Sequence, residues 1–200
     1  MNFTKNLCRL CIIFTVMILM ACAGAVKENS LDDPALVIAG NKQTEMKVRF
    51  ERALAHQNSG EHEEAKVIYK SLLSNDGALI SPVFNLGVIA VHQTQLAEAK
   101  KYFEIVIKRN PNHKQSLNYL GYIARDYGAF DEAEVYYRRL LEIDQNDELA
   151  IRNLAILLDL YRGRLEEALV LYEKYQSLQA EPDPRVKDWI FDTRNRLKAK

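Results

Sequence analysis

The 200-residue sequence contains few of the residues that interrupt or cross-link a chain: eight glycines, five prolines and three cysteines. Scarce glycine and proline, with abundant Ala, Leu, Glu, Lys and Arg, favour a helical protein. Cys22 is the last cysteine, so the part of the chain that follows it cannot form an internal disulfide. The 27 basic and 27 acidic side chains balance to a formal net charge of zero, which argues against a nucleic-acid-binding protein.

Motifs that carry chemistry are also missing. None of the four histidines has His-Glu-x-x-His spacing or stands beside a cysteine, which gives a zinc site little support; they are His56, His62, His92 and His113. His62, in the acidic stretch GEHEEA, is interpreted as part of a solvated turn. The sequence has no Gly-x-x-x-x-Gly-Lys phosphate loop and no Gly-x-Ser-x-Gly nucleophile elbow. We therefore expect no catalysis, no metal and no cofactor.

The first 21 residues have the composition of a secretory signal. Lys5 and Arg9 precede the apolar run LCIIFTVMILMACAG, and small residues end it. From Leu10 to Ala25 the run is short for a membrane-spanning helix, which needs roughly 20 residues. A cleaved signal is therefore favoured, and a retained membrane anchor is the alternative.

The end of this run, Leu19-Met20-Ala21-Cys22, resembles the lipobox of bacterial lipoproteins. The resemblance implies cleavage after Ala21, with diacylglycerol and an amide-linked acyl chain such as palmitate on Cys22. Several chains would anchor the protein firmly, at about 0.8 kcal/mol for each buried CH₂. Cys22 is followed by Ala-Gly and not by the Asp that often marks inner-membrane retention, which implies an outer-membrane lipoprotein that faces the periplasm.

Residues 22–45 then form a lipidated N-terminus and a tether. The charges of this stretch and its Pro34 argue against a long helix. The apolar segment ALVIAG either docks on the first helix pair or belongs to a loose linker, and the sequence leaves both interpretations open.

From Met46 onwards a small residue recurs at separations of 34, 34 and 35 residues, as Ala65, Ala99, Ala133 and Ala168. An aromatic residue follows each alanine after four residues, as Tyr69, Phe103, Tyr137 and Tyr172. Because residues i and i+4 share one face of a helix, each of these helices presents a small residue and a ring on the same side.

A second set of small residues precedes the first by twelve or thirteen positions, as Ala53, Gly87, Gly121 and Ala155. These residues would let the backbone or ring of a neighbouring helix approach closely. Gly60, Gly128 and Gly163 separate the paired helices, and Thr94 stands in place of glycine in the second pair. The pattern predicts pairs of helices packed tightly against each other.

The pattern resembles the tetratricopeptide repeat, a 34-residue helix–turn–helix unit with an early Leu-Gly pair and a later Ala. The resemblance implies an all-α, right-handed superhelix of about four repeats, at residues 46–79, 80–113, 114–147 and 148–182. Residues 183–200 would form a capping helix that begins at Asp183 and Pro184. Its apolar stripe is Val186, Trp189, Ile190 and Leu197, and its water-facing residues are Lys187, Arg194, Arg196 and Lys198.

The resemblance also implies a partner-binding groove, because certain positions of each first helix line the concave face in this family. The predicted groove residues are Phe50, Leu54, Phe84, Val88, Tyr122, Arg125, Arg152 and Ile156. His92, Asp126 and Asp159 lie further along the same face. The Lys–Asn pair with which some family members hold a C-terminal carboxylate is absent. The surface suits an amphipathic helix or an extended apolar segment, unless the tether or another repeat fills it.

Two function classes follow. The first is a non-catalytic scaffold, lipid-anchored at the envelope, that resembles pilotins, pilus-assembly lipoproteins and adaptors of periplasmic proteases. The second is an accessory of an enzyme complex for proteolysis, cell-wall synthesis or polysaccharide export. In both, the partner is a protein, the membrane is reached through the lipid, and nucleic acid plays no part. Assembly into a homo-oligomer is left open.

Overall fold

The computed structural model describes residues 34–199 of the chain. The predicted signal peptide, the lipobox and Cys22 lie outside the described residues. The described part contains nine α-helices and no strand. The described part belongs to two units that meet at residue 47: residues 34–47, the beginning of helix α2, fall in the first, and residues 48–199 fall in the second.

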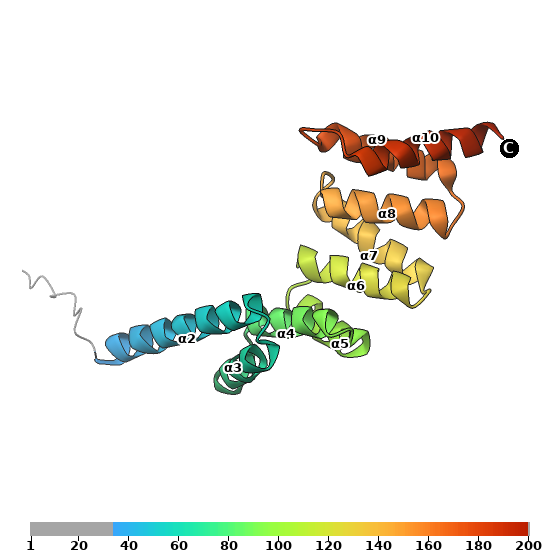
Figure 1. The fold of residues 1–200 in the computed structure, drawn as a ribbon. Helices are drawn as coiled ribbons and strands as arrows, with labels where there is room; N and C mark the ends of the chain where they lie inside the picture. Colours follow the sequence, from blue (N-terminus) through green and yellow to red (C-terminus); the bar gives the residue numbers. More distant parts are fainter. Residues whose placement is uncertain (1–33, 200) are drawn as a thin grey trace, which may run out of the picture. The chain divides into compact units, whose positions relative to one another are not determined.

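The helices follow one another with short connections (Figure 1). Their bounds are α2 Pro34–Asn58, α3 His62–Asn75, α4 Ile80–His92, α5 Leu96–Arg109, α6 Lys114–Asp126, α7 Phe130–Ile143, α8 Glu148–Leu160, α9 Leu165–Leu178 and α10 Pro184–Lys198. Helices α4, α6 and α8 begin at Ile80, Lys114 and Glu148, which are the first residues of the second, third and fourth predicted repeats.

Helix α2 corrects the prediction for the tether. It begins at Pro34 and runs for 25 residues, so the expectation that residues 34–45 avoid a long helix is wrong. The physical reason is the position of the proline. Pro34 is the first helical residue, where the missing N–H would have had no partner within the helix and where the fixed φ angle suits the helix.

The core of residues 48–200 is built from the two sets of small residues and the rings. The second-helix alanines Ala65, Ala99, Ala133 and Ala168 are all buried, as are Tyr69, Phe103, Tyr137 and Tyr172. A Cβ added at Gly87 would come within 2.7 Å of Phe103 Cε1, and one at Gly121 within 2.5 Å of Tyr137 Cε1. The predicted close approach is confirmed: each glycine accommodates the ring of the second helix of its own repeat.

The turns between paired helices use the left-handed backbone region. Gly60, Gly128 and Gly163 have φ angles of 79°, 75° and 62°. Thr94 occupies the equivalent turn with a φ of 58°, and it is the only non-glycine residue with a positive φ in the part of the chain that the structure describes. A β-branched residue is strained in this region, so the second repeat has an energetically costly turn.

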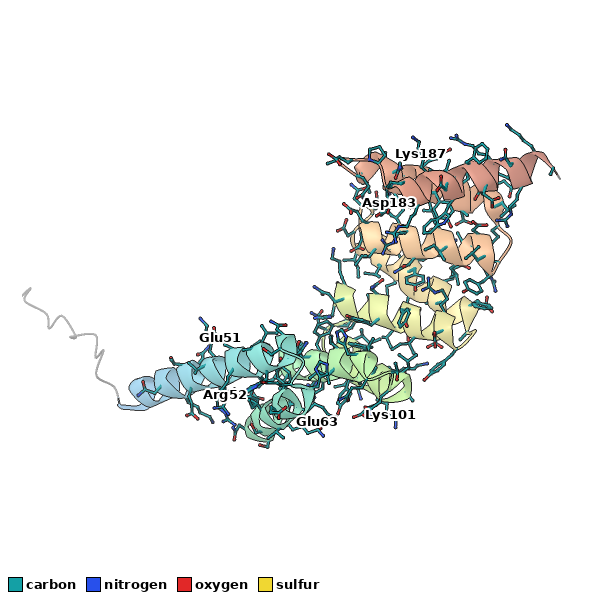
Figure 2. The ribbon with its side chains drawn as sticks, in the orientation of Figure 1. Glu51, Arg52, Glu63, Lys101, Asp183 and Lys187 are labelled. Carbon is teal, nitrogen blue, oxygen red and sulfur yellow. The ribbon has the colours of Figure 1, made fainter. Side chains whose placement is uncertain are left out.

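Helix α10 packs on α9, and Asp183 caps it by accepting a hydrogen bond from the Arg185 backbone N–H at 3.0 Å. Val186 and Ile190 are buried, and the Trp189 ring lies 5.6 Å from that of Tyr172. Lys187 is exposed, as predicted (Figure 2). These contacts agree with the predicted apolar stripe on the helix.

Arg196 differs from its prediction. It was expected to face water, but its Nη1 lies 2.7 Å from Oδ1 of Asp159, a residue that is only 5% exposed. The Asp159 carboxylate also accepts hydrogen bonds from the Tyr172 hydroxyl at 3.3 Å and the Thr193 hydroxyl at 3.4 Å. Asp159 therefore lies in a buried polar network under α10 and not on an open surface. The helical stripe alone could not show this, because Asp159 lies 37 residues before its partner.

Candidate partner-binding site

The eight predicted groove residues all lie on the first helices of the repeats. Phe50 and Leu54 come from α2, Phe84 and Val88 from α4, Tyr122 and Arg125 from α6, and Arg152 and Ile156 from α8. Leu54 is exposed and the other seven side chains are partly buried. Helices α6 and α8 contact each other and lie side by side (Figure 1), so the residues of the third and fourth repeats belong to one continuous surface. We refer below to the faces of the first helices that carry these eight residues as the first-helix surface.

Phe84 contributes to both this surface and the core. It was expected to face the groove rather than the space between helices, yet its ring centroid lies 5.7 Å from that of Phe103 and 5.0 Å from that of His113. Phe50 packs against Tyr69 in the same way, at 5.6 Å. A phenylalanine at the fifth position of a repeat is long enough to reach the buried ring of the second helix, so its removal would disturb the fold.

Tyr119 was missed by the sequence analysis. Its ring stacks on that of Phe103 at 4.7 Å, with an interplanar angle of 3°, and lies 6.1 Å from that of Phe84. The cluster therefore joins the second repeat to the first helix of the third. Nothing in the repeat pattern marks Tyr119, because only this repeat has an aromatic residue at its sixth position.

Two arginines of the predicted groove lie over aromatic rings. The Arg125 Cζ is 5.9 Å from the centroid of Tyr122, and the Arg152 Cζ is 5.8 Å from that of Tyr175. A guanidinium over a ring is attracted by the negative face of the π-system, at about 0.5–1 kcal/mol for exposed sites. Both contacts hold a positive charge near the first-helix surface.

The first helices of the third and fourth repeats are connected by a polar contact. Asn118 Oδ1 accepts a hydrogen bond from Nδ2 of Asn153 at 2.9 Å, which ties α6 to α8. The Asn118 amide oxygen is therefore already used within the protein. Arg125, Arg152 and the ring of Tyr122 lie on the same two helices, and Asp126 on α6 is exposed beside them.

The hydroxyl groups of the buried rings have partners in only two repeats. Tyr69 donates to Gln57 Oε1 at 3.0 Å, and Tyr172 donates to Asp159 Oδ2 at 3.3 Å. The Tyr137 hydroxyl is buried and has no hydrogen-bond partner among residues 34–199. Burial raises the pKa of Tyr137 to about 12, and the positive charge of Arg125 opposes that rise.

The second helices of the third and fourth repeats are connected by a charged cluster on α7 and α9. Glu134 lies 2.7 Å from Arg138 and 2.7 Å from Arg164, and both arginines also pair with Glu167. Burial tends to raise the pKa of Glu134, but the hydrogen bonds from Arg138 and Arg164 outweigh it and hold the pKa below its usual value. All four charges have partners, so we assign this cluster a structural role.

His62 also differs from its interpretation as a solvated residue. It is the first residue of α3, its ring stacks on that of His92 at 5.8 Å, and its Nδ1 is buried.

Among the described residues, no group of three or more His, Cys, Asp or Glu side chains could hold a metal ion. None of the described helices is long and apolar enough to cross a membrane.

Residues 84–148 match the family model for the tetratricopeptide repeat. A relative from Drosophila melanogaster, the protein O-mannosyl-transferase Tmtc3, is 26% identical over 148 residues, which cover 74% of this chain and 16% of the relative. The chain thus corresponds to a small part of that protein's length.

Solved structures show the same fold at low sequence identity. MamA from Desulfovibrio magneticus RS-1 superposes with a TM-score of 0.68 and 18% identity, over 76% of this chain and 85% of MamA. YrrB, described as a TPR protein with an unusual peptide-binding site, gives a TM-score of 0.58 and 22% identity, over 66% of this chain and 67% of YrrB. Residues 84–148 thus match the tetratricopeptide-repeat pattern, and the described part of the chain has the all-α repeat fold predicted from its sequence.

Proposed function

We propose that the chain is a non-catalytic scaffold that binds a partner protein on its first-helix surface. The fold supports this, since tetratricopeptide repeats act as protein-interaction scaffolds. The observation that carries the proposal is a row of partly exposed side chains at the same position of successive first helices. Val88, Tyr122 and Ile156 each stand at the ninth position of a repeat and keep part of their surface exposed.

The partner on this account presents an apolar or amphipathic segment. Leu54, Val88 and Ile156 supply aliphatic surface at the ninth position of their repeats, and Tyr122 supplies a ring at the same position. A row of apolar residues on successive first helices matches the apolar face of an amphipathic helix or alternate residues of an extended chain. Arg125 and Arg152 flank the row and would fix the direction of the bound segment.

The proposed location is the periplasmic side of the bacterial outer membrane, with the lipid on Cys22 as the anchor. The support comes from the sequence alone: the apolar run that ends in Leu-Met-Ala-Cys and the Ala-Gly that follows. In that location the scaffold would assist assembly or localisation of a pilus or secretion-type complex. The alternative is an adaptor of a periplasmic enzyme complex, and the two are distinguished by the partner that is recovered.

Co-purification from detergent extracts tests the binding proposal. Tyr122→Ala is the variant of choice, because Phe84 also packs in the core and its loss would affect folding. Val135→Ala on α7 is the matched control, since Val135 is 63% exposed but lies on a second helix. We expect the Tyr122 variant to lose the partner while it keeps its helical circular dichroism, and the control to keep both. Partner recovery that is equal in the two variants would exclude the first-helix surface.

A further inference from the structure

The third, seventh and tenth residues of a first helix lie on one face of that helix. In the second, third and fourth repeats the first helix packs on the second helix of the preceding repeat, and all three positions are buried. The seventh residue is a leucine in each of these repeats, and the tenth is Ile89, Ile123 or Leu157. A repeat therefore attaches to the repeat before it through this face.

The first repeat has the same face, but nothing in the part of the chain from residue 48 onwards covers it. Counted from Met46, the three residues are Val48, Arg52 and Ala55, and all are exposed, Val48 at 58%. Arg52 stands where the other repeats have leucine, and its side chain makes no hydrogen bond or ion pair within residues 34–199. We refer to these three residues as the α2 face.

Helix α10 occupies the place of the first helix of a fifth repeat. Counted from Pro184, the third, seventh and tenth residues are buried as the helix packs on α9, and they are Val186, Ile190 and Thr193. The ring of the sixth residue, Trp189, lies 5.6 Å from that of Tyr172. In the same way Tyr119, the sixth residue of α6, stacks on Phe103 of the preceding repeat. Helix α10 is thus attached to the array as α4, α6 and α8 are.

The eighth residue of a first helix faces the second helix of its own repeat, as the ring of Tyr137 beside Gly121 shows. This residue is small and buried in all four repeats, as Ala53, Gly87, Gly121 and Ala155. In α10 it is Phe191, which is 70% exposed. No second helix follows α10 within residues 34–199, so this end of the array also has an uncovered face. We refer to Asp188 and Phe191 as the α10 face.

Each of the two faces carries one apolar and one charged residue about one helical turn apart. Val48 and Arg52 are separated by four residues and Asp188 and Phe191 by three, which is roughly 5 Å along a helix. Asp188 is exposed and, like Arg52, has no side-chain partner within residues 34–199. If the two helices lie antiparallel, Val48 meets Phe191 while Arg52 meets Asp188. In a parallel arrangement each charge would meet an apolar residue.

We propose that the chain binds a second copy of itself end to end, with the α2 face of one copy lying antiparallel on the α10 face of the next. Charge complementarity identifies this occupant, because the chain itself carries the complement of each of its uncovered faces. Glu51 and Lys187, which are exposed beside Arg52 and Asp188, also have opposite charges (Figure 2). The contact joins two different faces, so it does not close, and each added copy leaves one face of each kind open. It does not use the first-helix surface and is independent of the proposed partner binding.

Variants that block one face at a time test the proposal in the full chain. Val48→Asp places a charge in the α2 face, and Phe191→Asp places one in the α10 face. Both side chains are exposed, so the fold should be kept, which circular dichroism checks. Each protein is prepared with two different affinity tags and mixed in a large excess of detergent micelles, so that two copies do not share a micelle. Capture through one tag then measures recovery of the other.

We expect wild-type chains to recover each other, and so should chains with Val135→Asp, a control at an exposed site on α7. Two Val48→Asp chains, or two Phe191→Asp chains, should not recover each other. A mixture of the two variants should, because the intact α10 face of one binds the intact α2 face of the other. The proposal is overturned by wild-type chains that do not associate, by identical variants that still do, or by mixed variants that do not.

Charge reversal tests the antiparallel order. Sedimentation velocity gives the protein concentration at which half of the chains are associated. Arg52→Glu alone, or Asp188→Arg alone, should raise this concentration about tenfold or more, since like charges placed together across an interface are strongly unfavourable. A chain that carries both substitutions should associate as the wild type does. A double variant no better than the single variants would show that the two residues do not meet, and would overturn the antiparallel contact.

Discussion

The ring of Tyr137 occupies the space that any side chain at Gly121 would need. An added Cβ would lie 2.5 Å from Tyr137 Cε1 and 2.9 Å from Cδ1, closer than carbon atoms pack in proteins. The two residues are sixteen positions apart, and the same separation joins Gly87 to Phe103. This contact fixes how closely the two helices of a repeat approach.

Gly121→Ala should therefore destabilise the protein. Overpacking a filled core costs typically about 1–3 kcal/mol, and the better helix propensity of alanine offsets about 1 kcal/mol of it. Thermal or urea unfolding measures the net loss. In a Tyr137→Leu background, where the clashing ring is gone, the same substitution should become neutral or stabilising. A Gly121→Ala protein that is more stable than its parent in both backgrounds would contradict the contact.

Thr94→Gly should stabilise the protein by about 1 kcal/mol, because it relieves a left-handed conformation that is costly for a β-branched residue. The hydrogen bond from the Thr94 hydroxyl to the Gln93 carbonyl is exposed, so its loss costs little. Gly128→Thr, at the same turn of the next repeat, is the reciprocal control and should lower the melting temperature. A decrease in melting temperature for Thr94→Gly would show that the threonine is needed at this turn.

Stability should fall as the pH is lowered below about 6.5, the usual pKa of histidine. Burial holds the pKa of His113 below that value, so the unfolded chain binds this proton more readily than the folded one does. The contribution of His113 to stability is thus complete above the pKa of the histidine in the unfolded chain. It decreases as the pH falls toward the lower pKa of His113 in the folded protein. The neutral ring is needed because His113 Nδ1 caps α6 by accepting from the Ser116 backbone N–H at 3.2 Å.

His113→Asn isolates this effect, since asparagine also caps helices but does not titrate. Urea unfolding at pH 7.5 and pH 5.5 should show a smaller loss of stability in the variant than in the wild type. Equal losses would assign the pH dependence to other groups.

Arg196→Met should loosen the C-terminal cap. It leaves the Asp159 carboxylate buried without its cation, and because Arg196 is itself 40% exposed we expect a loss of about 1–3 kcal/mol. Amide hydrogen exchange should accelerate in α9 and α10 more than in α4 and α5. Adding Asp159→Asn should restore part of the stability; a double variant less stable than Arg196→Met would argue against the pair.

Much of the fold could be predicted because the small residues and rings recur at fixed spacing. Ala133 and Tyr137 are both buried, as expected for residues four positions apart on one face of a helix. The start of α2 was missed because Pro34 was interpreted as a helix breaker, whereas the first turn of a helix accepts proline. The Asp159–Arg196 pair was missed because it joins residues that are distant in sequence, which periodicity cannot detect.

The candidate site was predicted in outline only. The repeat register places Phe84 and Tyr122 on first helices, but it does not say how far a side chain reaches, and the Phe84 ring extends to Phe103. The Tyr137 hydroxyl has no hydrogen-bond partner among residues 34–199, and the sequence analysis did not predict this. Spacing alone could not have shown it, because only the structure shows that the hydroxyls of Tyr69 and Tyr172 have acceptors.

Photo-crosslinking in living cells tests the central claim most directly. A photoreactive phenylalanine analogue is placed at Tyr122, on the first-helix surface, or at Val135, on the exposed side of α7. We predict that irradiation joins the Tyr122 protein, and not the Val135 protein, to one discrete partner, and that Arg125→Gln weakens the adduct. An adduct formed from Val135 with none from Tyr122 would contradict the account and assign binding to the second helices.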